Sequence, residues 1–443
     1  MTKPIFTISG LRGIFGKDLT QQLVTKYAKC FGKYLDGQNI AVGRDSRLSG
    51  PKMLLAVTEG LFKIHYNIYD FGICPTPAIV MMVKKMGLDG GIQITASHNP
   101  EEWNGLKFIS QTGRFLYLEE VNQFKKQLKR KSDNVNLSTY PNFIKKDIID
   151  SYLQNIINSE FFKKTHYKKF KVAIDSCNGA AEESAIRLVK MLGSIPISIN
   201  KPGNRFPRAP EPKAENLKKL CAIVRKQKLD FGIAFDPDGD RFACVDETGT
   251  PLSEEASVLL ATWFILEQKK GPVVVNNSTT MAVEEICKKY NIPVYRSKTG
   301  EINVVKRMQE VNAIVGGEGN GGVIIPKINT TRDGLVATAI VLSLLSKKHC
   351  PLSSIRKELP QYYMLKTRMT NYKENWQKII RKKYQDDKEM KIDTQEGLKI
   401  IGSNFWILLR KSNTEPILRV IAESDNRSLT NNLIVDIIKE IKI

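Results

Sequence analysis

The sequence predicts an α/β protein with three similar mixed α/β domains, a smaller α+β domain at the C-terminus and a central cleft. One order of elements recurs three times: an apolar strand, a polar loop, a stretch of helical periodicity, a second strand and, further on, a strand–loop–strand. The recurring unit is longer than the roughly 20 to 50 residues of a solenoid repeat, so it indicates separate domains. The pattern changes after about residue 360, which indicates that the last part folds differently.

The three units follow one another along the chain. The first contains the segments 39–47, 50–67, 68–72 and 90–108. The second contains 171–179, 180–193, 196–200 and 231–246, and the third contains 272–280, 281–291, 293–300 and 312–326. Because strands alternate with helices, we expect sheets that are at least partly parallel. Loops at strand ends carry the chemistry of such sheets, so we expect the unusual loops that end the three units at equivalent places.

The C-terminal part reads as two apolar strands around a polar loop at 404–424, followed by an amphipathic helix at 429–443. Since domains usually contain roughly 100 to 150 residues, the 443 residues suggest three or four of them. We predict four domains, with boundaries at 1–149, 150–248, 249–360 and 361–443.

Composition narrows the class of protein. The formal net charge is +22, which would suit nucleic-acid binding, but the basic residues are spread along the chain without the order of a recognition module. A solvated, lysine-rich surface explains the charge better, and its positive field still attracts anionic small substrates. We therefore expect no specific nucleic-acid partner.

The location follows from cysteine usage and hydropathy. Seven scattered cysteines without a C-x-x-C pair argue against a disulfide framework and a zinc site. No apolar run approaches the roughly 18 residues of a membrane span, and the N-terminus does not resemble a signal peptide. We expect a cytoplasmic protein without a membrane partner, either a monomer or a homodimer.

The loop of the first unit presents a serine. Asn99 and Pro100 end the strand directly after Ser97, so the serine is expected to be exposed in a fixed turn, as a nucleophile or a phosphate carrier. A hydrolase is disfavoured because the G-x-S-x-G elbow is absent and His98, the sequence neighbour, is poorly placed as a base. An ordinary capped turn fits this loop equally well on its own.

The loop of the second unit reads FDPDGDR and places Asp236, Asp238 and Asp240 at alternate positions between two strands. Three close carboxylates need a neutralising cation, and oxygen ligands select a hard ion such as Mg²⁺. An EF-hand is excluded because Arg241 stands at loop position six, where glycine is required, and because the flanks are strands. A plain acidic turn is the remaining alternative.

Two further loops carry polar side chains. GGEGNGG supplies Glu318 and Asn320 among glycines that allow close approach of backbone to a ligand, although a plain hairpin turn fits equally well. A carboxylate and an amide are suitable partners for sugar hydroxyls. The C-terminal loop contains a donor-rich set suited to a phosphate dianion, or else forms a polar hairpin; the set is Arg410, Ser412, Asn413, Thr414 and Arg419.

Together, these loops supply what transfer of a phosphoryl group to and from a sugar requires: a serine, a cation cage, a hydroxyl-binding loop and a phosphate clamp. The sequence resembles the α-D-phosphohexomutases, the family of phosphoglucomutase, phosphomannomutase and phosphoglucosamine mutase. The resemblance covers essentially the whole chain. Its motifs fall in family order: GLRG at 10–13, TASHNP at 95–100, DPDGDR at 236–241, GEGNGG at 317–322 and RKSNTEPILR at 410–419.

The resemblance implies a role for each motif. Ser97 would be the phosphoserine, with Arg12 and Lys107 beside its phosphate and Lys107 helping as general acid or base. Mg²⁺ would be bound by Asp236, Asp238, Asp240 and an oxygen of the phosphoserine at Ser97, with Arg241 next to the ion. Sugar hydroxyls would be held by Glu318 and Asn320, and the substrate's phosphate by Arg410, Ser412, Asn413, Thr414 and Arg419.

The implied reaction interconverts a hexose 6-phosphate and a hexose 1-phosphate. The phosphoserine donates its phosphoryl group to the free hydroxyl, which makes a hexose 1,6-bisphosphate that serves as intermediate and as activator. The bisphosphate then reorients in the cleft and returns its other phosphoryl group to Ser97. A non-catalytic sugar-phosphate sensor is a weaker alternative, because the serine and all three aspartates are present.

The sugar loop departs from the common family pattern. Many members carry G-E-x-S-G-H, whereas Asn320 and Gly322 stand here at the Ser and His positions, and Glu301 stands where some relatives have histidine. We expect Gly322 to leave room and to remove one donor, which favours tolerance of several sugars. The chain length favours glucosamine phosphates as substrates, with a phosphomannomutase/phosphoglucomutase of mixed specificity as the alternative.

Overall fold

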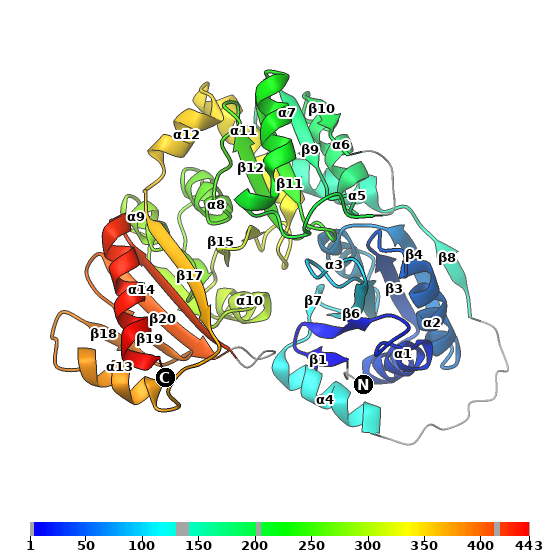
Figure 1. Cartoon of the computed structure of the whole chain (residues 1–443). Coiled ribbons are helices and arrows are strands. Elements are labelled where there is room, and N and C mark those ends of the chain that lie inside the picture. Colours follow the sequence, from blue (N-terminus) through cyan, green and yellow to red (C-terminus); the bar gives the residue numbers. More distant parts are fainter. Residues whose placement is uncertain (1–3, 130–140, 201–204, 412–416, 443) are drawn as a thin grey trace.

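The computed structural model describes residues 4–129, 141–200, 205–411 and 417–442. Figure 1 shows four groups of strands and helices around a common centre, in chain order from blue to red. Each group has its own sheet: three sheets mix parallel and antiparallel strands, and the last is antiparallel throughout. The predicted fold class, with three similar α/β domains and a different fourth, is confirmed.

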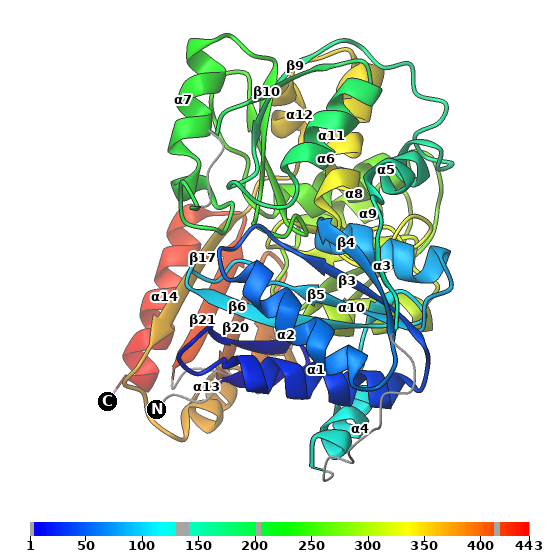
Figure 2. The same ribbon diagram turned by 90° about the vertical axis from the view of Figure 1, so that its right-hand side faces the viewer.

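The first domain has the largest sheet, in the order β1-β2-β6-β5-β3-β4-β8, with β7 paired to β6. Its strands are β1 (Ile5–Thr7), β2 (Gly10–Ile14), β3 (Asn39–Arg44), β4 (Asn67–Ile73), β5 (Gly90–Ile94), β6 (Trp103–Ser110), β7 (Arg114–Phe115) and β8 (Phe143–Lys145). Its helices are α1 (Gln21–Leu35), α2 (Gly50–Phe62), α3 (Thr76–Lys85) and α4 (Leu118–Lys129). Figure 2 shows α1 and α2 side by side in front of this sheet.

The second and third domains have four strands each. The second contains α5 (Ile149–Ile157), β9 (Lys171–Asp175), α6 (Glu182–Met191), β10 (Ile195–Ser198), a 3₁₀ turn (Ala214–Asn216), α7 (Lys218–Lys226), β11 (Phe231–Phe235) and β12 (Phe242–Asp246). The third contains α8 (Ala256–Leu266), β13 (Val273–Asn276), α9 (Ala282–Lys288), β14 (Val294–Ser297), α10 (Glu301–Glu310), β15 (Val315–Glu318), β16 (Gly322–Ile324), α11 (Gly334–Lys348) and α12 (Leu352–Glu358).

One four-strand arrangement recurs in the first three sheets. The orders β4-β3-β5-β6, β10-β9-β11-β12 and β14-β13-β15-β16 each combine three parallel strands with an antiparallel fourth. The loop between the last two strands carries Ser97 in the first domain, the three aspartates in the second and Asn320 in the third. The expectation that these loops lie at equivalent places is confirmed.

The first three domains share one apolar core. A single cluster of buried side chains includes Val80 from α3, Leu153 from α5, Phe264 from α8 and Leu342 from α11. Helix α11 lies at its centre, because it packs against α5, α6, α8, β12 and β16 and is buried from Gly334 to Ser346. Strand β13, which reads Val-Val-Val-Asn, is buried along its whole length and apolar up to its last residue, because parallel strands are covered on both faces.

The fourth domain has a core of its own, in which Trp376 and Ile380 of α13 pack with Ile407 of β20 and Ile437 of α14. Its sheet has the order β17-β21-β20-β19-β18, and α14 packs on β21 and β17. Its elements are β17 (Tyr363–Met369), α13 (Trp376–Tyr384), β18 (Lys391–Asp393), β19 (Leu398–Ile401), β20 (Phe405–Lys411), β21 (Leu418–Ser424) and α14 (Arg427–Ile441).

The sequence predicted β20, β21 and α14 but not the other three strands of this domain. Strand β17 was missed because most of its side chains are exposed or half-buried, so it shows no apolar alternation. Helix α14 begins two residues before the predicted 429, because the side chain of Asn426 accepts hydrogen bonds from the amides of Ser428 and Leu429.

Among the described residues, no single helix has both the length and the apolar composition to cross a membrane. Helices α11 and α12 pass that test only as a pair, and they are bent by 93° relative to each other.

Candidate active site

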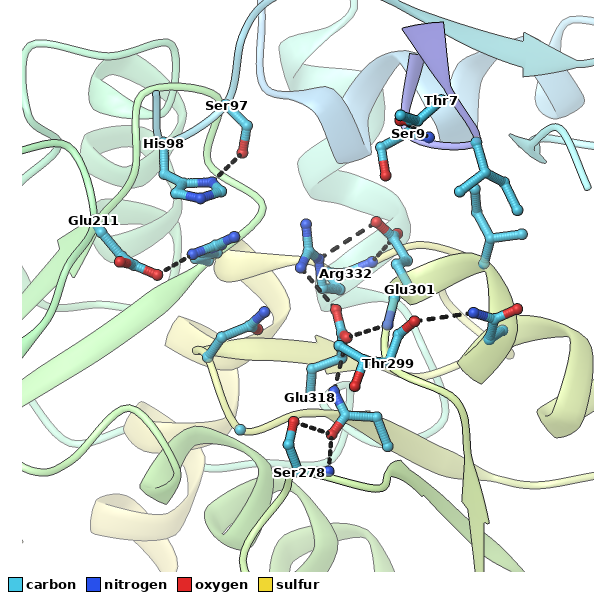
Figure 3. A pocket seen from close by; sticks show the side chains of 18 of the residues that line it. Thr7, Ser9, Ser97, His98, Glu211, Ser278, Thr299, Glu301, Glu318 and Arg332 are labelled. Atoms are coloured by element: carbon cyan, nitrogen blue, oxygen red, sulfur yellow. Dashed lines mark hydrogen bonds and ion pairs between the residues drawn. The ribbon is translucent and has the colours of Figure 1, made fainter. Parts of the chain in front are cut away.

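The three hairpin loops and the edge of the fourth domain surround a cavity of about 920 Å³. The predicted site residues that line it come from all four domains: Arg12, Ser97, Lys107, Arg241, Glu318, Asn320, Arg410 and Arg419. Figure 3 shows Ser97 and His98 on one wall, with Glu301, Glu318 and Arg332 grouped on another. Residues far apart in sequence are thus brought to one place, as the equivalent loop positions require.

Ser97 lies in a strained turn directly after β5. Its φ of 50° is in the left-handed region, which residues other than glycine rarely adopt. Its amide donates to Oγ1 of Thr95 at 2.9 Å, and its carbonyl accepts from Nη2 of Arg47 at 2.6 Å. Arg47, which is buried, also donates to the carbonyls of Asn99, Pro100 and Trp103. One guanidinium therefore fixes the backbone of the whole loop.

The expectation of an exposed serine was wrong. Ser97 is 1% exposed, because its loop lies at the wall of the cavity beneath the neighbouring domains. Its hydroxyl lies 3.5 Å from Nδ1 of His98 and donates to Oδ2 of Asp236 at 3.3 Å. Arg241, burial and Arg12 together lower the pKa of His98 well below its ordinary value. The ring is therefore neutral beside the hydroxyl.

The three aspartates of the second loop form a buried cluster. One carboxylate oxygen from each aspartate lies within 4.8 Å of one carboxylate oxygen from each of the other two. Asp236 uses Oδ1 to accept from the amide of Arg241, while Oδ1 of Asp238 and Oδ1 of Asp240 are buried without a hydrogen-bond partner. Burial and the charges of Asp240 and Asp238 raise the pKa of Asp236 well above its ordinary value. Uncompensated buried carboxylate oxygens fit a hard divalent cation.

Lys107 supplies part of the positive charge opposite this cluster. Its ammonium lies 2.6 Å from Oδ2 of Asp238 and 3.0 Å from Oδ2 of Asp240. Burial alone would lower the pKa of Lys107, but the two carboxylates raise it above its ordinary value, so the side chain is held as an ammonium ion. Thr76 also donates to Oδ2 of Asp238, at 2.6 Å. Oδ2 is therefore occupied in both Asp238 and Asp240, which leaves Oδ1 of these two residues for a metal.

The sugar loop holds Glu318 at the end of β15. Oε1 accepts from Nδ2 of Asn276 at 2.8 Å and from the amide of Gly300 at 2.9 Å, and Oε2 accepts from Nη1 of Arg332 at 2.9 Å. Oδ1 of Asn320 is buried and has no hydrogen-bond partner. A fixed carboxylate and an unpaired amide oxygen can both accept hydrogen bonds from hydroxyl groups.

The expectation that Gly322 leaves room was also wrong. A Cβ atom at this position would lie 2.2 Å from Cδ and 2.9 Å from Cγ of Arg332. The space is filled by the arginine, which follows β16 by several residues and reaches back across the loop. A donor is therefore present at this point of the cavity, and it comes from a residue that the sequence did not indicate.

The remaining predicted residues form the cationic part of the cavity wall. Arg410 of β20 and Arg419 of β21 are paired across adjacent strands, and burial together with the charge of Arg419 lowers the pKa of Arg410. Arg12 donates to Oδ1 of Asn99 at 2.8 Å, and Arg241 forms an ion pair with Glu211. Ser412, Asn413 and Thr414 lie outside the described residues, so their predicted role is untested.

Several residues of the site were missed by sequence reasoning. Arg47, Glu211 and Arg332 all make charged contacts with the predicted residues. Arg47 follows Asp45 at a distance of two residues at the end of a strand, a pattern that could have drawn attention to it. Arg332 has no such local signal, since its partners Asp240 and Glu318 lie 92 and 14 residues away.

Comparison with known proteins gives consistent results. Models of the phosphoglucomutase/phosphomannomutase family match the chain with alpha/beta/alpha domain I at 3–134, domain II at 150–249, domain III at 253–363 and the C-terminal domain at 364–440. The chain is 34% identical to a phosphoglucosamine/phosphogalactosamine mutase of Sulfurisphaera tokodaii, covering 98% of both chains. It is also 34% identical to a phosphoglucomutase/phosphomannomutase of Thermococcus kodakarensis, over 95% of this chain and 94% of the relative.

The fold is shared with solved structures. A phosphoglucomutase/phosphomannomutase family protein from Burkholderia thailandensis superposes with a TM-score of 0.86 at 24% identity, covering 98% of this chain and 97% of the other. Four consecutive domain matches, full-length relatives and the serine, aspartate and glutamate loops around one cavity agree with the family that the motifs indicated. The chain belongs to the phosphoglucomutase/phosphomannomutase family.

Proposed function

We propose that the protein is a phosphohexomutase that interconverts a hexose 6-phosphate and a hexose 1-phosphate through a phosphoserine at Ser97. The observation that carries the proposal is the hydrogen bond from the Ser97 hydroxyl to Asp236, which joins the serine at the cavity wall to the fully buried aspartate cluster. The paired arginines Arg410 and Arg419 line the same cavity. A phosphosugar can therefore present one group to the serine while a phosphate group meets the arginines.

Asp236, Asp238 and Asp240 are the proposed Mg²⁺ ligands. Their fit rests on the unpaired buried oxygens and on the oxygen-only donor set. Bound there, the cation would draw charge from the oxygens of a phosphoryl group on Ser97. Lys107 and Arg12 provide positive charge from the protein side, and the raised pKa of Lys107 favours the acid over the base among its two proposed roles.

In the proposed reaction, the substrate's phosphate binds at Arg410 and Arg419 while Glu318 and Asn320 accept hydrogen bonds from sugar hydroxyls. The free hydroxyl of the sugar attacks the phosphoserine, its proton is taken up by a base, and the O–P bond to Ser97 breaks. The 1,6-bisphosphate then turns over, so that its other phosphate faces Ser97 and is transferred back. Hydroxyl contacts shared by both orientations are what Glu318 can supply, because its carboxylate is held by three donors.

Glucosamine phosphates are the proposed substrates. The names of the relatives support this choice, since one acts on glucosamine and galactosamine phosphates by name and another is named for glucose and mannose phosphates. Mixed use of glucose and mannose phosphates is therefore the alternative. Hydroxyls 3 and 4 are alike in glucosamine, glucose and mannose, so contacts at Glu318 serve these three sugars equally.

The test begins with the intact mass of the purified protein. We expect a species heavier by one phosphate that disappears in Ser97→Ala together with most of the mutase activity. Ser110→Ala is the matched control, because Ser110 is another buried serine of this domain and does not line the cavity. Full activity of Ser97→Ala in the presence of a hexose 1,6-bisphosphate would refute the assignment.

The substrate is tested by kcat/KM for glucosamine 1-phosphate, glucose 1-phosphate and mannose 1-phosphate. We expect glucosamine 1-phosphate to be at least comparable to the other two, and Glu318→Gln to damage all three alike. A preference of several hundredfold for glucose or mannose phosphate would reject the glucosamine proposal and leave the reaction class in place.

A further inference from the structure

Arg332 contacts carboxylates from three separate segments of the chain. Nη2 lies 2.8 Å from Oδ2 of Asp240, Nη1 lies 2.9 Å from Oε2 of Glu318, and Nε lies 3.4 Å from Oε2 of Glu301. The side chain is 9% exposed and lines the cavity, and Figure 3 shows it between Glu301 and Glu318. One guanidinium thus connects the loop that carries the aspartates to the loop that carries Glu318.

The backbone of Arg332 is held rigidly by its neighbours. The amide of Arg332 donates to Oε1 of Glu301 at 2.9 Å. The next residue, Asp333, caps α11 by accepting from the amides of Leu335 and Val336, and its own amide donates to the carbonyl of Val323 at 2.9 Å. Because α11 is the central buried helix, Arg332 projects from a fixed platform.

The contacts of Arg332 determine which carboxylate oxygens remain available. Oδ2 of Asp240 accepts from both Lys107 and Arg332, so Oδ1 is the oxygen left to face a cation. Oε1 of Glu318 accepts from two donors and Oε2 accepts from Arg332 alone. Since a carboxylate oxygen accepts about two hydrogen bonds, Oε2 keeps one position for a sugar hydroxyl, directly beside the guanidinium.

We propose that Arg332 is a positioning residue that orients Asp240 toward the metal and Glu318 toward the sugar, and that position 322 must be glycine because the arginine occupies its side-chain space. This inference rests on the proposed function, which assigns Mg²⁺ to Asp240 and the sugar to Glu318. The rigid planar fork of arginine fixes the directions of two carboxylates relative to each other, whereas the ammonium group of a lysine attracts carboxylates without imposing such directions. The proposal therefore ties Asp240 of the second domain and Glu318 and Gly322 of the third to one side chain.

The first experiment substitutes no charged residue. Gly322→Ala puts a Cβ within 2.2 Å of Cδ of Arg332 and must displace that side chain. Gly50→Ala is the matched control, because its Cβ would lie 3.4 Å from Cδ of another arginine, Arg44, in ordinary contact and away from the cavity. Binding of Mn²⁺, as a probe for the divalent site, is measured by calorimetry without any sugar.

We expect at least threefold weaker Mn²⁺ binding in Gly322→Ala, because Asp240 loses the contact that turns its free Oδ1 toward the cation, and no change in Gly50→Ala. We also expect the KM for the hexose phosphate to rise at least tenfold in Gly322→Ala, through loss of the Glu318 orientation, with a smaller change in kcat. Unchanged or tighter Mn²⁺ binding in Gly322→Ala would overturn the positioning of Asp240 by Arg332. Since this binding needs no turnover, it decides the matter even if the protein has no mutase activity.

The second experiment is a double-mutant cycle with Arg332→Ala, which empties the space beside position 322. If the two residues act through one contact, Gly322→Ala should have little further effect on KM in the Arg332→Ala background. Effects that multiply would contradict the proposal. Arg332→Lys keeps the charge and should raise KM as Gly322→Ala does, so the proposal remains testable if Arg332→Ala fails to fold.

Discussion

The contacts among the first three domains differ in kind from those that attach the fourth. The first three share one apolar cluster, in which the ring of Phe264 stacks on that of Phe162 at a centroid distance of 5.5 Å. The fourth domain keeps a separate core and meets the third through ion pairs and hydrogen bonds and through one small apolar cluster, in which Met281 packs against residues such as Trp406 and Leu408. The chain therefore combines a three-domain body that shares a large apolar cluster with a fourth domain that is attached by a much smaller apolar contact.

Four contacts illustrate the polar attachment. Lys366 of β17 forms ion pairs with Glu254 at 3.2 Å and with Glu255 at 3.1 Å. Lys399 of β19 donates to the carbonyl of Asn277 at 2.6 Å. Oε2 of Glu423 accepts from the amide of Met281 at 2.7 Å. Polar interfaces of this kind resemble transient protein–protein contacts, so relative motion of the two bodies is expected.

The comparison predicts two unfolding transitions, one for the three-domain body and one for the fourth domain. Substitutions in the two cores should give the largest effects on these transitions. Phe264→Ala should destabilise the three-domain body by about 3 to 5 kcal/mol, because it opens a cavity in a fully packed core. Trp376→Ala is the matched change in the core of the fourth domain and should shift only that domain's transition by a similar amount. Urea denaturation followed by a probe in each part separates them; a single shared shift in both variants would contradict the comparison.

The next effect concerns pH at the polar interface. Burial raises the pKa of Glu255 to about 7, against the attraction of Lys366, with Glu423 and Glu254 also nearby. The pKa of Glu255 is higher in the folded protein than in the unfolded chain. Its stabilising contribution to the free energy of unfolding is therefore present below about pH 4.3 and is lost as pH rises through about 7. We expect a loss on the order of 3 kcal/mol between these limits.

Glu255→Gln imitates the protonated side chain and should remove this pH dependence. The free energy of unfolding of both proteins is to be measured at pH 5 and pH 8. We expect the free energy of unfolding of the variant to exceed that of the parent by more at pH 8 than at pH 5. Parallel curves for the two proteins would show that Glu255 does not titrate in this range.

An effect of similar size is expected at Glu423, whose Oε2 also accepts from Nε1 of Trp406 at 2.6 Å. Glu423→Leu leaves this indole N–H and the Met281 amide without their acceptor, at about 1 to 3 kcal/mol for each unpaired group. The shift should appear in the transition of the fourth domain. Limited proteolysis should cut between the third and fourth domains faster in the variant than in the parent, and equal rates would argue against a bracing role.

The smallest effect is expected for Lys366→Met. The lysine side chain is 41% exposed, so its ion pairs should contribute about 1 kcal/mol or less. Salt should weaken the attachment in the parent protein and have less influence in the variant. Denaturation at increasing sodium chloride concentrations measures the loss of stability in Lys366→Met and its dependence on salt. A loss of stability well above about 1 kcal/mol would mean that the polar interface is stronger than the comparison of the domains implies.

Local patterns predicted much of the fold and of the site. The three repeated units were found because each strand and helix has its own periodicity, and the loops were found because their residue types adjoin in sequence. Ser97, Asp236 and Glu318 needed no knowledge of the packing. Their equivalent places at the strand ends followed from the shared order of elements in the three units.

What the sequence could not predict depends on contacts between distant segments. The burial of Ser97 results from the domains that pack around it, and no local pattern encodes this. Gly322 looked like an empty position because Arg332, which fills the space, lies ten residues further along. Arg47 acts on a loop 50 residues away, so its four bonds to backbone carbonyls are visible only in three dimensions.

The recurring four-strand arrangement has a consequence for the engineering of this chain. Three hairpins of one topology carry the proposed phosphoserine, the proposed Mg²⁺ ligands and the proposed sugar ligands, so one scaffold serves three proposed chemical tasks. Each task resides in a few residues between two strands whose pairing does not depend on them. We expect such loops to behave as cassettes: grafting a relative's β15–β16 loop, together with its counterpart to Arg332, should transfer sugar preference without refolding the sheet.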